Sequence, residues 1–119
     1  MGLASTASAQ TDAPTGQSLF IDNCSACHQA NGAGVKGAFP ALAGNPLVQG
    51  DASPLVGVVL KGRGGMPTFK DDLNDADIAA ILTYARASWG NKAPAVAPRI
   101  VAEARAKLDA NATHSLQAH

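Results

Sequence analysis

Five consecutive residues restrict this chain more than any other part of it: Cys24-Ser25-Ala26-Cys27-His28, which contain both of its cysteines. Cys-x-x-Cys followed directly by His is the attachment signature of a c-type haem. Two thiols about one helical turn apart can each form a thioether with a porphyrin vinyl group, and the adjacent imidazole can then bind the iron. The motif therefore predicts one covalent haem c attached through Cys24 and Cys27, with His28 as an axial ligand.

Three other interpretations of the cysteine pair were weighed. A structural zinc site usually has four protein ligands, and the remaining histidines, His114 and His119, lie in the C-terminal tail. A thioredoxin-like pair belongs beside a βαβ pattern, and no strand-rich run is found near it. A disulfide between residues three apart would be strained. The haem interpretation is favoured over all three.

A second axial ligand is commonly a methionine sulfur, and beyond Met1 the chain offers only Met66. Met66 lies in the glycine-rich run Lys61-Gly62-Arg63-Gly64-Gly65-Met66-Pro67. Glycines let the backbone pass close to a flat ligand, and Pro67 restricts the backbone of the residue before it. A methionine that only fills a core gap is the alternative. We predict that His28 and Met66 are the two iron ligands.

Length, charge and hydropathy exclude several classes of protein. The 119 residues suffice for one domain, and a bound apolar group would help a chain this short to fill its core. Nine basic residues balance nine acidic ones, which argues against a nucleic-acid partner. No apolar stretch is long enough to span a bilayer. We expect neither nucleic-acid binding nor a membrane span.

The chain divides into three expected parts. Residues 1–14 are small and polar and are predicted to be disordered, as the remainder of an export signal or an artificial start; Ala7-Ser8-Ala9 has the small residues of a cleavage site. Residues 15–91 form the predicted haem domain. Residues 92–119 are expected to be a stiff Ala-Pro linker, a short helix over about 99–109, and a frayed tail from Ala110.

Hydrophobic periodicity and turn residues predict the helices of the domain. A first helix is expected over about 15–24, followed by a long loop over 29–50 that is rich in glycine and proline. A second helix is expected over about 53–61, although its valines also suit a strand. The clearest helix runs from Asp75 to Trp89, with Asn74 as its N-cap and Gly90 as its stop.

Residues 15 to 90 resemble a class I c-type cytochrome, the bacterial monohaem cytochrome c. The resemblance implies an all-α fold of about four to five helices wrapped around one covalent haem. It also implies that Gly16 and Phe20 on the first helix meet Tyr84 on the last. The carbonyl that orients the axial imidazole would belong to Pro40, and Met66 fits the distal ligand. Arg63 would pair with a haem propionate, or would be an ordinary solvated side chain.

The segments 62–69 and 80–91, the second ending in Ser88-Trp89-Gly90-Asn91, are similar to cytochrome domains of periplasmic sugar and alcohol dehydrogenases. This likeness implies export to the periplasm, a redox protein such as a dehydrogenase as electron donor, and a respiratory acceptor. Such domains often occur with other haem modules, whereas this chain has a single haem motif.

Two axial ligands would leave no open position at the iron, so the predicted role is a single-electron carrier rather than an enzyme. The alternatives are a peroxidase-like enzyme or a gas-binding sensor, either of which would need the Met66 position to be open. The absence of a lysine ring predicts an apolar docking patch with little dependence on salt.

Overall fold

A computed structural model describes residues 14–117, and within them the chain is helical, with two isolated bridges and no longer strand. The all-α fold class is therefore confirmed. The export-signal remnant and His119 lie outside the described residues, as do the side chains of residues 113–117 with His114. The described helices are α1 (Gly16–Asn23), α2 (Ser25–His28), α3 (Pro46–Gln49), α4 (Ala52–Lys61), α5 (Asp75–Arg86) and α6 (Pro98–Gln117).

Helices α1 and α5 pack across each other at a point where glycine is required. A Cβ built on Gly16 would lie 2.3 Å from the Ala80 carbonyl oxygen, so only glycine permits this approach. Phe20, one turn further along α1, is buried, and its ring centroid lies 5.6 Å from that of Tyr84. The predicted meeting of Gly16 and Phe20 with Tyr84 is confirmed.

Local sequence signals start both helices. Thr15 and Ser18 form a capping box at the beginning of α1, since each side chain accepts a hydrogen bond from the other residue's backbone N–H. At α5 the Asn74 side chain accepts from the Asp77 N–H, as predicted. One core unites the helices, and its buried hydrophobic members are Phe20, Val48, Leu55, Val56, Leu60, Leu73, Ile78, Ala79, Ile81, Leu82, Ala85, Val96 and Val101.

The structure corrects three predicted boundaries. The long loop contains a one-turn helix, α3, which Asn45 caps through hydrogen bonds from the Leu47 and Val48 N–H groups. Helix α5 ends at Arg86 rather than at Trp89, because two side chains later in the sequence donate hydrogen bonds to carbonyl oxygens in its last turn. Ser88 donates to the Tyr84 oxygen, and Asn91 donates to the Ala85 oxygen.

The last helix is the third correction. Helix α6 continues to Gln117, so the tail from Ala110 that was expected to be frayed is helical as far as it is described. The first half of α6 buries Val101 in the core and packs on α4 and α5. Once these contacts nucleate the helix, alanine-rich sequence extends it at little cost.

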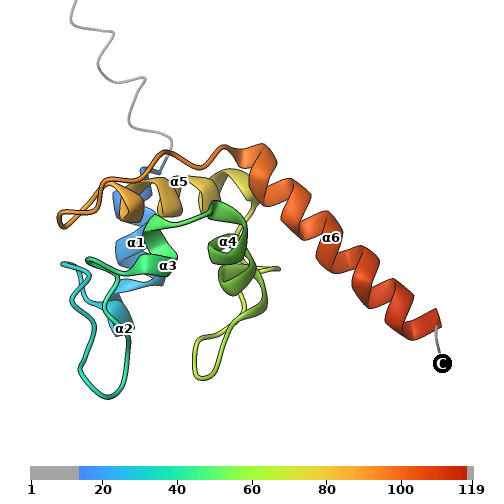
Figure 1. The fold of residues 1–119 in the computed structure, drawn as a ribbon, viewed down its shortest axis with the longest axis horizontal. Helices are drawn as coiled ribbons and strands as arrows, with labels where there is room; N and C mark the ends of the chain where they lie inside the picture. The colour runs from blue at the N-terminus through green and yellow to red at the C-terminus, as the bar shows by residue number, and fades with distance from the viewer. Residues whose placement is uncertain (1–13, 118–119) are drawn as a thin grey trace, which may run out of the picture.

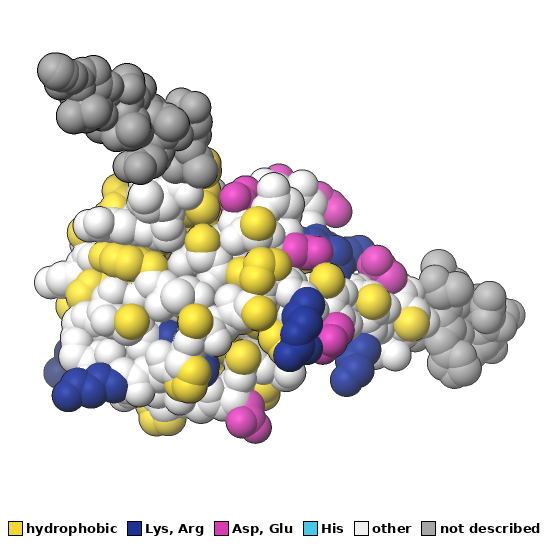
Figure 2. Space-filling model, turned by 90° about the horizontal axis from the view of Figure 1, so that it is seen from above, with side chains coloured by type: hydrophobic (Ala, Val, Ile, Leu, Met, Phe, Trp, Pro, Cys, Tyr) yellow, Lys and Arg dark blue, Asp and Glu magenta, His cyan; other side chains and the backbone are white. Residues whose placement is uncertain are grey.

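The ribbon has two distinct sides (Figure 1). The loop after α2 and the loop between α4 and α5 project from the same side of the helices, whereas the segment between α5 and α6 crosses the opposite side. Seen from that opposite side, dark blue Lys and Arg side chains and magenta Asp and Glu side chains are mixed over the end of the molecule that α6 forms (Figure 2). No helix in residues 14–117 is both long enough and apolar enough to cross a membrane.

Candidate functional site

The Cys-x-x-Cys-His motif occupies the junction of α1 and α2. Cys24 ends the first helix and begins the second, with φ −124° and ψ −27°. The Cys27 and His28 N–H groups both point back to the Cys24 carbonyl oxygen, at 3.3 Å and 3.0 Å. The two thiols are thus held about one turn apart on a short helix, with the imidazole directly after them.

The imidazole of His28 is oriented by the backbone of the following loop. Its Nδ1 lies 2.9 Å from the Pro40 carbonyl oxygen. A carbonyl oxygen only accepts, so Nδ1 carries the proton and the lone pair is left on Nε2. Such a bond fixes the tautomer and ring orientation of a metal-binding histidine. The structure brings together His28 and Pro40, which the resemblance paired.

Gly34 makes this arrangement possible. Its φ is +65°, and a Cβ there would lie 2.4 Å from the Phe39 oxygen and 2.6 Å from the Pro40 oxygen. The Gly34 N–H also donates to the His28 carbonyl oxygen at 2.9 Å. Only glycine lets the loop fold back closely enough to bring the Pro40 carbonyl to the imidazole.

The end of α5 supports the same loop from the other side. The Trp89 ring lies 5.1 Å from that of Phe20 between centroids, and its Nε1 donates to the Ala30 oxygen at 3.2 Å. Asn91, which is buried, accepts from the Gly44 N–H and donates to the Leu42 oxygen. Both ends of the loop over 30–44 are therefore tied to one helix terminus.

Met66 lies in a tight reversal of the other loop. The Arg63 and Met66 backbones exchange hydrogen bonds of 3.1 Å and 2.9 Å. Gly62, with φ +77°, is needed here because a Cβ would lie 2.6 Å from the Met66 carbonyl oxygen. Met66 is half-buried, whereas the Arg63 side chain is exposed and forms no ion pair with the described residues. The pairing of Arg63 with a propionate stays a prediction.

No disulfide joins Cys24 and Cys27. Burial, and secondarily the proximity of Cys27, raise the pKa of Cys24 to about 11. Among the side chains that the structure describes, which do not include those of His114 and His119, no three His, Cys, Asp or Glu gather closely enough to hold a metal ion by themselves.

The residues present fit a haem. Two free thiols and an imidazole with its Nε2 lone pair available supply the attachment set. Large apolar side chains in the neighbouring segments are unusually exposed: Ile21 by 39%, Val35 by 41% and Phe39 by 38%. A haem bound at the attachment residues would be an apolar group beside these side chains.

Comparison with known proteins agrees with this geometry. A family model described as "Cytochrome C oxidase, cbb3-type, subunit III" matches residues 11–84, well over half of the chain. The chain belongs to this family of c-type cytochromes. Covalently bound haem c and electron transport come with the family, and the class I resemblance is confirmed. Cys24 and Cys27 are the cysteines that the attachment motif supplies.

The cytochrome is similar to subunits of larger dehydrogenases. It is 37% identical over 91 residues to the "Alcohol dehydrogenase (quinone), cytochrome c subunit" of Gluconobacter oxydans, covering 66% of this chain and 19% of that protein. It is 35% identical over 97 residues to the "Gluconate 2-dehydrogenase cytochrome c subunit" of Pantoea cypripedii, covering 71% and 22%. The chain thus spans about a fifth of the length of these relatives.

A smaller relative is "Cytochrome c-552" of Thermus thermophilus. The two proteins are 35% identical over 83 residues, which cover 57% of this chain and 63% of the relative. The similarity therefore extends both to a protein named as a cytochrome in its own right and to subunits of dehydrogenases.

Sequence reasoning missed the two buried polar residues, Arg86 and Asn91, that join α5 to loops of the fold. Arg86 is buried and donates to the carbonyl oxygens of Val48, Gly50 and Pro94. The sequence indicated Asn91 only as the last residue of a segment similar to dehydrogenase cytochrome domains. A single sequence carries no signal that a given arginine or asparagine will be enclosed by backbone carbonyls.

Proposed function

We propose that this cytochrome is an exported, periplasmic single-electron carrier whose haem iron is bound by His28 and Met66, and that it passes electrons from a dehydrogenase toward the respiratory chain. Haem, when bound, supplies an iron that alternates between its ferric and ferrous forms. The protein's own residues determine how the iron is held and how closely a partner can approach it.

The observation that carries the proposal is the 2.9 Å contact between His28 Nδ1 and the Pro40 oxygen. It fixes the proton on Nδ1 and leaves Nε2 as the ligand atom, and a hydrogen-bonded histidine is a stronger donor to iron. The second position is assigned to Met66 because its loop projects from the same side as the His28 loop (Figure 1). A thioether there favours ferrous iron and raises the reduction potential.

The partner and the location rest on the relatives. Two of them are named as cytochrome c subunits of alcohol and gluconate dehydrogenases, which supports a dehydrogenase as the electron donor. Covalent attachment through Cys-x-x-Cys-His implies maturation outside the cytoplasm, which supports the periplasm. A role as one module of a larger assembly and a role as a separate shuttle both agree with this proposal.

Binding of carbon monoxide to the reduced protein tests the proposed role. With His28 and Met66 both bound, the wild type should take up carbon monoxide weakly, and Met66→Ala should take it up readily because it opens the distal position. The conservative control is Lys61→Ala, an exposed residue in the same segment, which should behave as wild type.

Rapid carbon monoxide binding by the wild type, equal to that of Met66→Ala, would contradict the carrier role. The distal position would then be open, and a peroxidase-like enzyme or a gas sensor would explain the protein better.

A further inference from the structure

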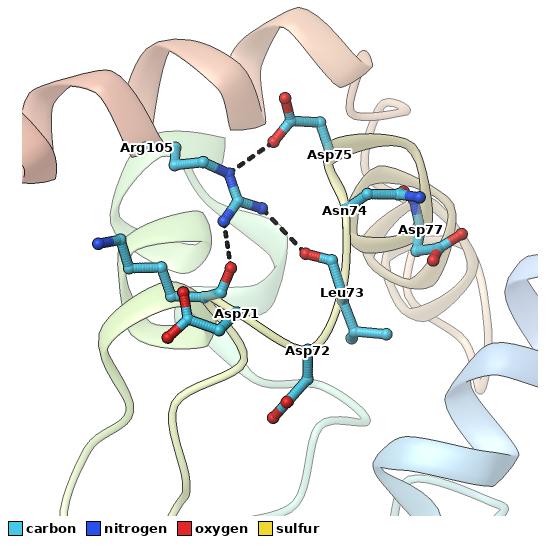
Figure 3. A pocket seen from close by; sticks show the side chains of 8 residues that line it. Asp71, Asp72, Leu73, Asn74, Asp75, Asp77 and Arg105 are labelled. Atoms are coloured by element: carbon cyan, nitrogen blue, oxygen red, sulfur yellow. Dashed lines mark hydrogen bonds and ion pairs between the residues drawn. The ribbon is translucent and has the colours of Figure 1, made fainter.

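Arg105 on α6 reaches across to the segment that leads from the Met66 loop into α5. Its Nε donates to the Asp75 carboxylate at 2.9 Å and its Nη2 to the Leu73 carbonyl oxygen at 3.0 Å. Nη1 donates to the Lys70 carbonyl oxygen. Figure 3 shows the guanidinium directed from α6 toward these acceptors, with the Asp72 and Asp77 carboxylates turned away from it.

A second interaction, an ion pair, joins α6 to the segment before α5. The Lys70 ammonium lies 2.8 Å from the Asp109 carboxylate, one turn further along α6. A hydrogen bond to Asp109, with its negative charge, raises the pKa of Lys70. Both groups are exposed, so this pair contributes less than the Arg105 contacts. Arg105 is only 22% exposed, and its fork fixes two carbonyls and a carboxylate at once.

The segment held by Arg105 is continuous with Met66. The loop returns from Met66 to α4, where the Phe69 N–H donates to the Val59 oxygen at 3.0 Å and Thr68 donates to the Leu60 oxygen. The chain then turns at residues 70–73, where the Leu73 N–H donates to the Phe69 oxygen at 3.2 Å. Helix α4 therefore anchors one side of the loop, and α6 anchors the turn that follows.

We propose that Arg105 is a positioning residue for Met66: by fixing the Lys70 and Leu73 carbonyls to α6, it keeps the loop closed and the Met66 sulfur on the iron. The inference rests on the proposed ligation by Met66. It also gives the C-terminal helix a role in the haem site, although no residue of α6 belongs to the attachment motif.

The planar fork of arginine is what allows one side chain to hold these three acceptors. A guanidinium presents several N–H donors in fixed directions, whereas an ammonium is a point charge on a flexible stem. Removing Arg105 leaves two partly buried carbonyls and a carboxylate to be satisfied by water. The free-energy difference that favours the closed loop over open forms then becomes smaller. A competing ligand then binds more tightly, because its apparent affinity rises with the fraction of open protein.

Titration of the oxidised holoprotein with imidazole measures this opening, since imidazole binds the iron only where the Met66 sulfur has left it. Arg105→Gln should bind imidazole about tenfold more tightly than the wild type, as expected for loss of charge-assisted hydrogen bonds. Arg105→Lys, which keeps the charge, should show a smaller but measurable increase in imidazole affinity. If Arg105→Gln does not accumulate as folded holoprotein, Arg105→Lys alone tests the positioning role.

Two controls separate positioning from general destabilisation. Arg99→Gln removes an exposed arginine that pairs with Glu103 on the same helix, and it should leave imidazole affinity unchanged. Val96→Ala removes buried side chain from the segment between α5 and α6, which provides none of the Arg105 partners. It should lower Tm without tightening imidazole binding.

The outcomes distinguish the two proposals. A wild type that shows the sulfur-to-iron absorption band, with unchanged imidazole affinity in both Arg105 variants, would overturn the positioning role alone. Equal tightening in Val96→Ala would overturn it as well, because any loss of stability would then open the loop. A wild type without the sulfur band would contradict ligation by Met66, and the role of Arg105 would fall with it.

Discussion

Asn91 shows how much a single buried amide can organise near the haem motif. It is 3% exposed, and its side chain makes three hydrogen bonds. The Gly44 N–H donates to Oδ1 at 2.8 Å, while Nδ2 donates to the carbonyl oxygens of Leu42 and Ala85 at 3.1 Å and 2.9 Å. The amide therefore hydrogen-bonds the last turn of α5 and fixes the position of residues 42–44, which follow Pro40 in the loop.

Replacing Asn91 by alanine should lower the free energy of unfolding by about 2–3 kcal/mol, because it leaves three backbone groups without partners in a site that excludes most water. Asn31→Ala is the matched control. Asn31 is exposed and accepts one bond from the Ala33 N–H, so the loss there should stay below about 1 kcal/mol. Denaturant unfolding measures both, and equal losses would contradict the structural role of Asn91.

At the residue scale, the sequence predicted the haem-attachment residues better than it predicted the residues that hold the surrounding loops in place. Cysteine and histidine at fixed spacing carry a recognisable pattern, and the resemblance supplied the partner of His28. Trp89, Asn91 and Arg105 act through tertiary contacts over 30 to 59 residues of chain. Such contacts leave no local pattern, because their partners are mostly backbone carbonyls that every residue has.

Among the helix pairs of the described residues, α1 and α5 make the most extensive contact. Thr15 and Asn74 cap the two helices, and Gly16 allows their backbones to meet at Ala80. Behind the crossing, Phe20, Tyr84 and Trp89 form a cluster of aromatic rings with centroids 5.1 to 5.7 Å apart. Aromatic pairs at such distances add to the stability gained from burial.

Gly16→Ala should destabilise the protein by at least about 2 kcal/mol, although alanine favours a helix, because the new methyl group forces α1 and α5 apart. Gln17→Ala changes the neighbouring exposed side chain of the same helix and should alter stability by no more than about 0.5 kcal/mol. Thermal unfolding of the two variants checks the prediction. A Gly16→Ala protein as stable as the wild type would show that the crossing adjusts freely.

Helix positions were predictable from hydrophobic periodicity at α1 and α4, and from periodicity together with the Asn74 cap at α5. Helix ends were not. Helix α5 stops early because Ser88 and Asn91 fold back onto its carbonyls, and α3 depends on the Asn45 cap within a proline-rich loop. The extent of α6 follows from docking of Val101 and Arg105, which a sequence window over the tail does not reveal.

Over the whole molecule, charge is balanced and dispersed. The chain has nine basic and nine acidic residues, and both signs occur together around α6 (Figure 2). The exposed apolar side chains Ile21, Val35 and Phe39 lie in segments adjoining the haem motif. A partner that approaches there meets apolar surface rather than a ring of charge.

Electron transfer to or from a redox protein should therefore depend weakly on salt. We expect the second-order rate constant to change less than about threefold over a tenfold rise in ionic strength, since steering by a neutral protein is slight. Stopped-flow kinetics with a quinone-type alcohol dehydrogenase would measure it. A steep fall with salt would mean that a charged patch, rather than apolar contact, guides the encounter.

The central claim is that His28 and Met66 both bind the iron of a covalently attached haem. The most direct measurement is the optical spectrum of the oxidised protein, for the wild type and Met66→Ala. The account predicts a low-spin haem in the wild type, with a sulfur-to-iron band that disappears in the variant while the haem stays attached to Cys24 and Cys27. A high-spin wild type without that band, indistinguishable from Met66→Ala, would contradict it.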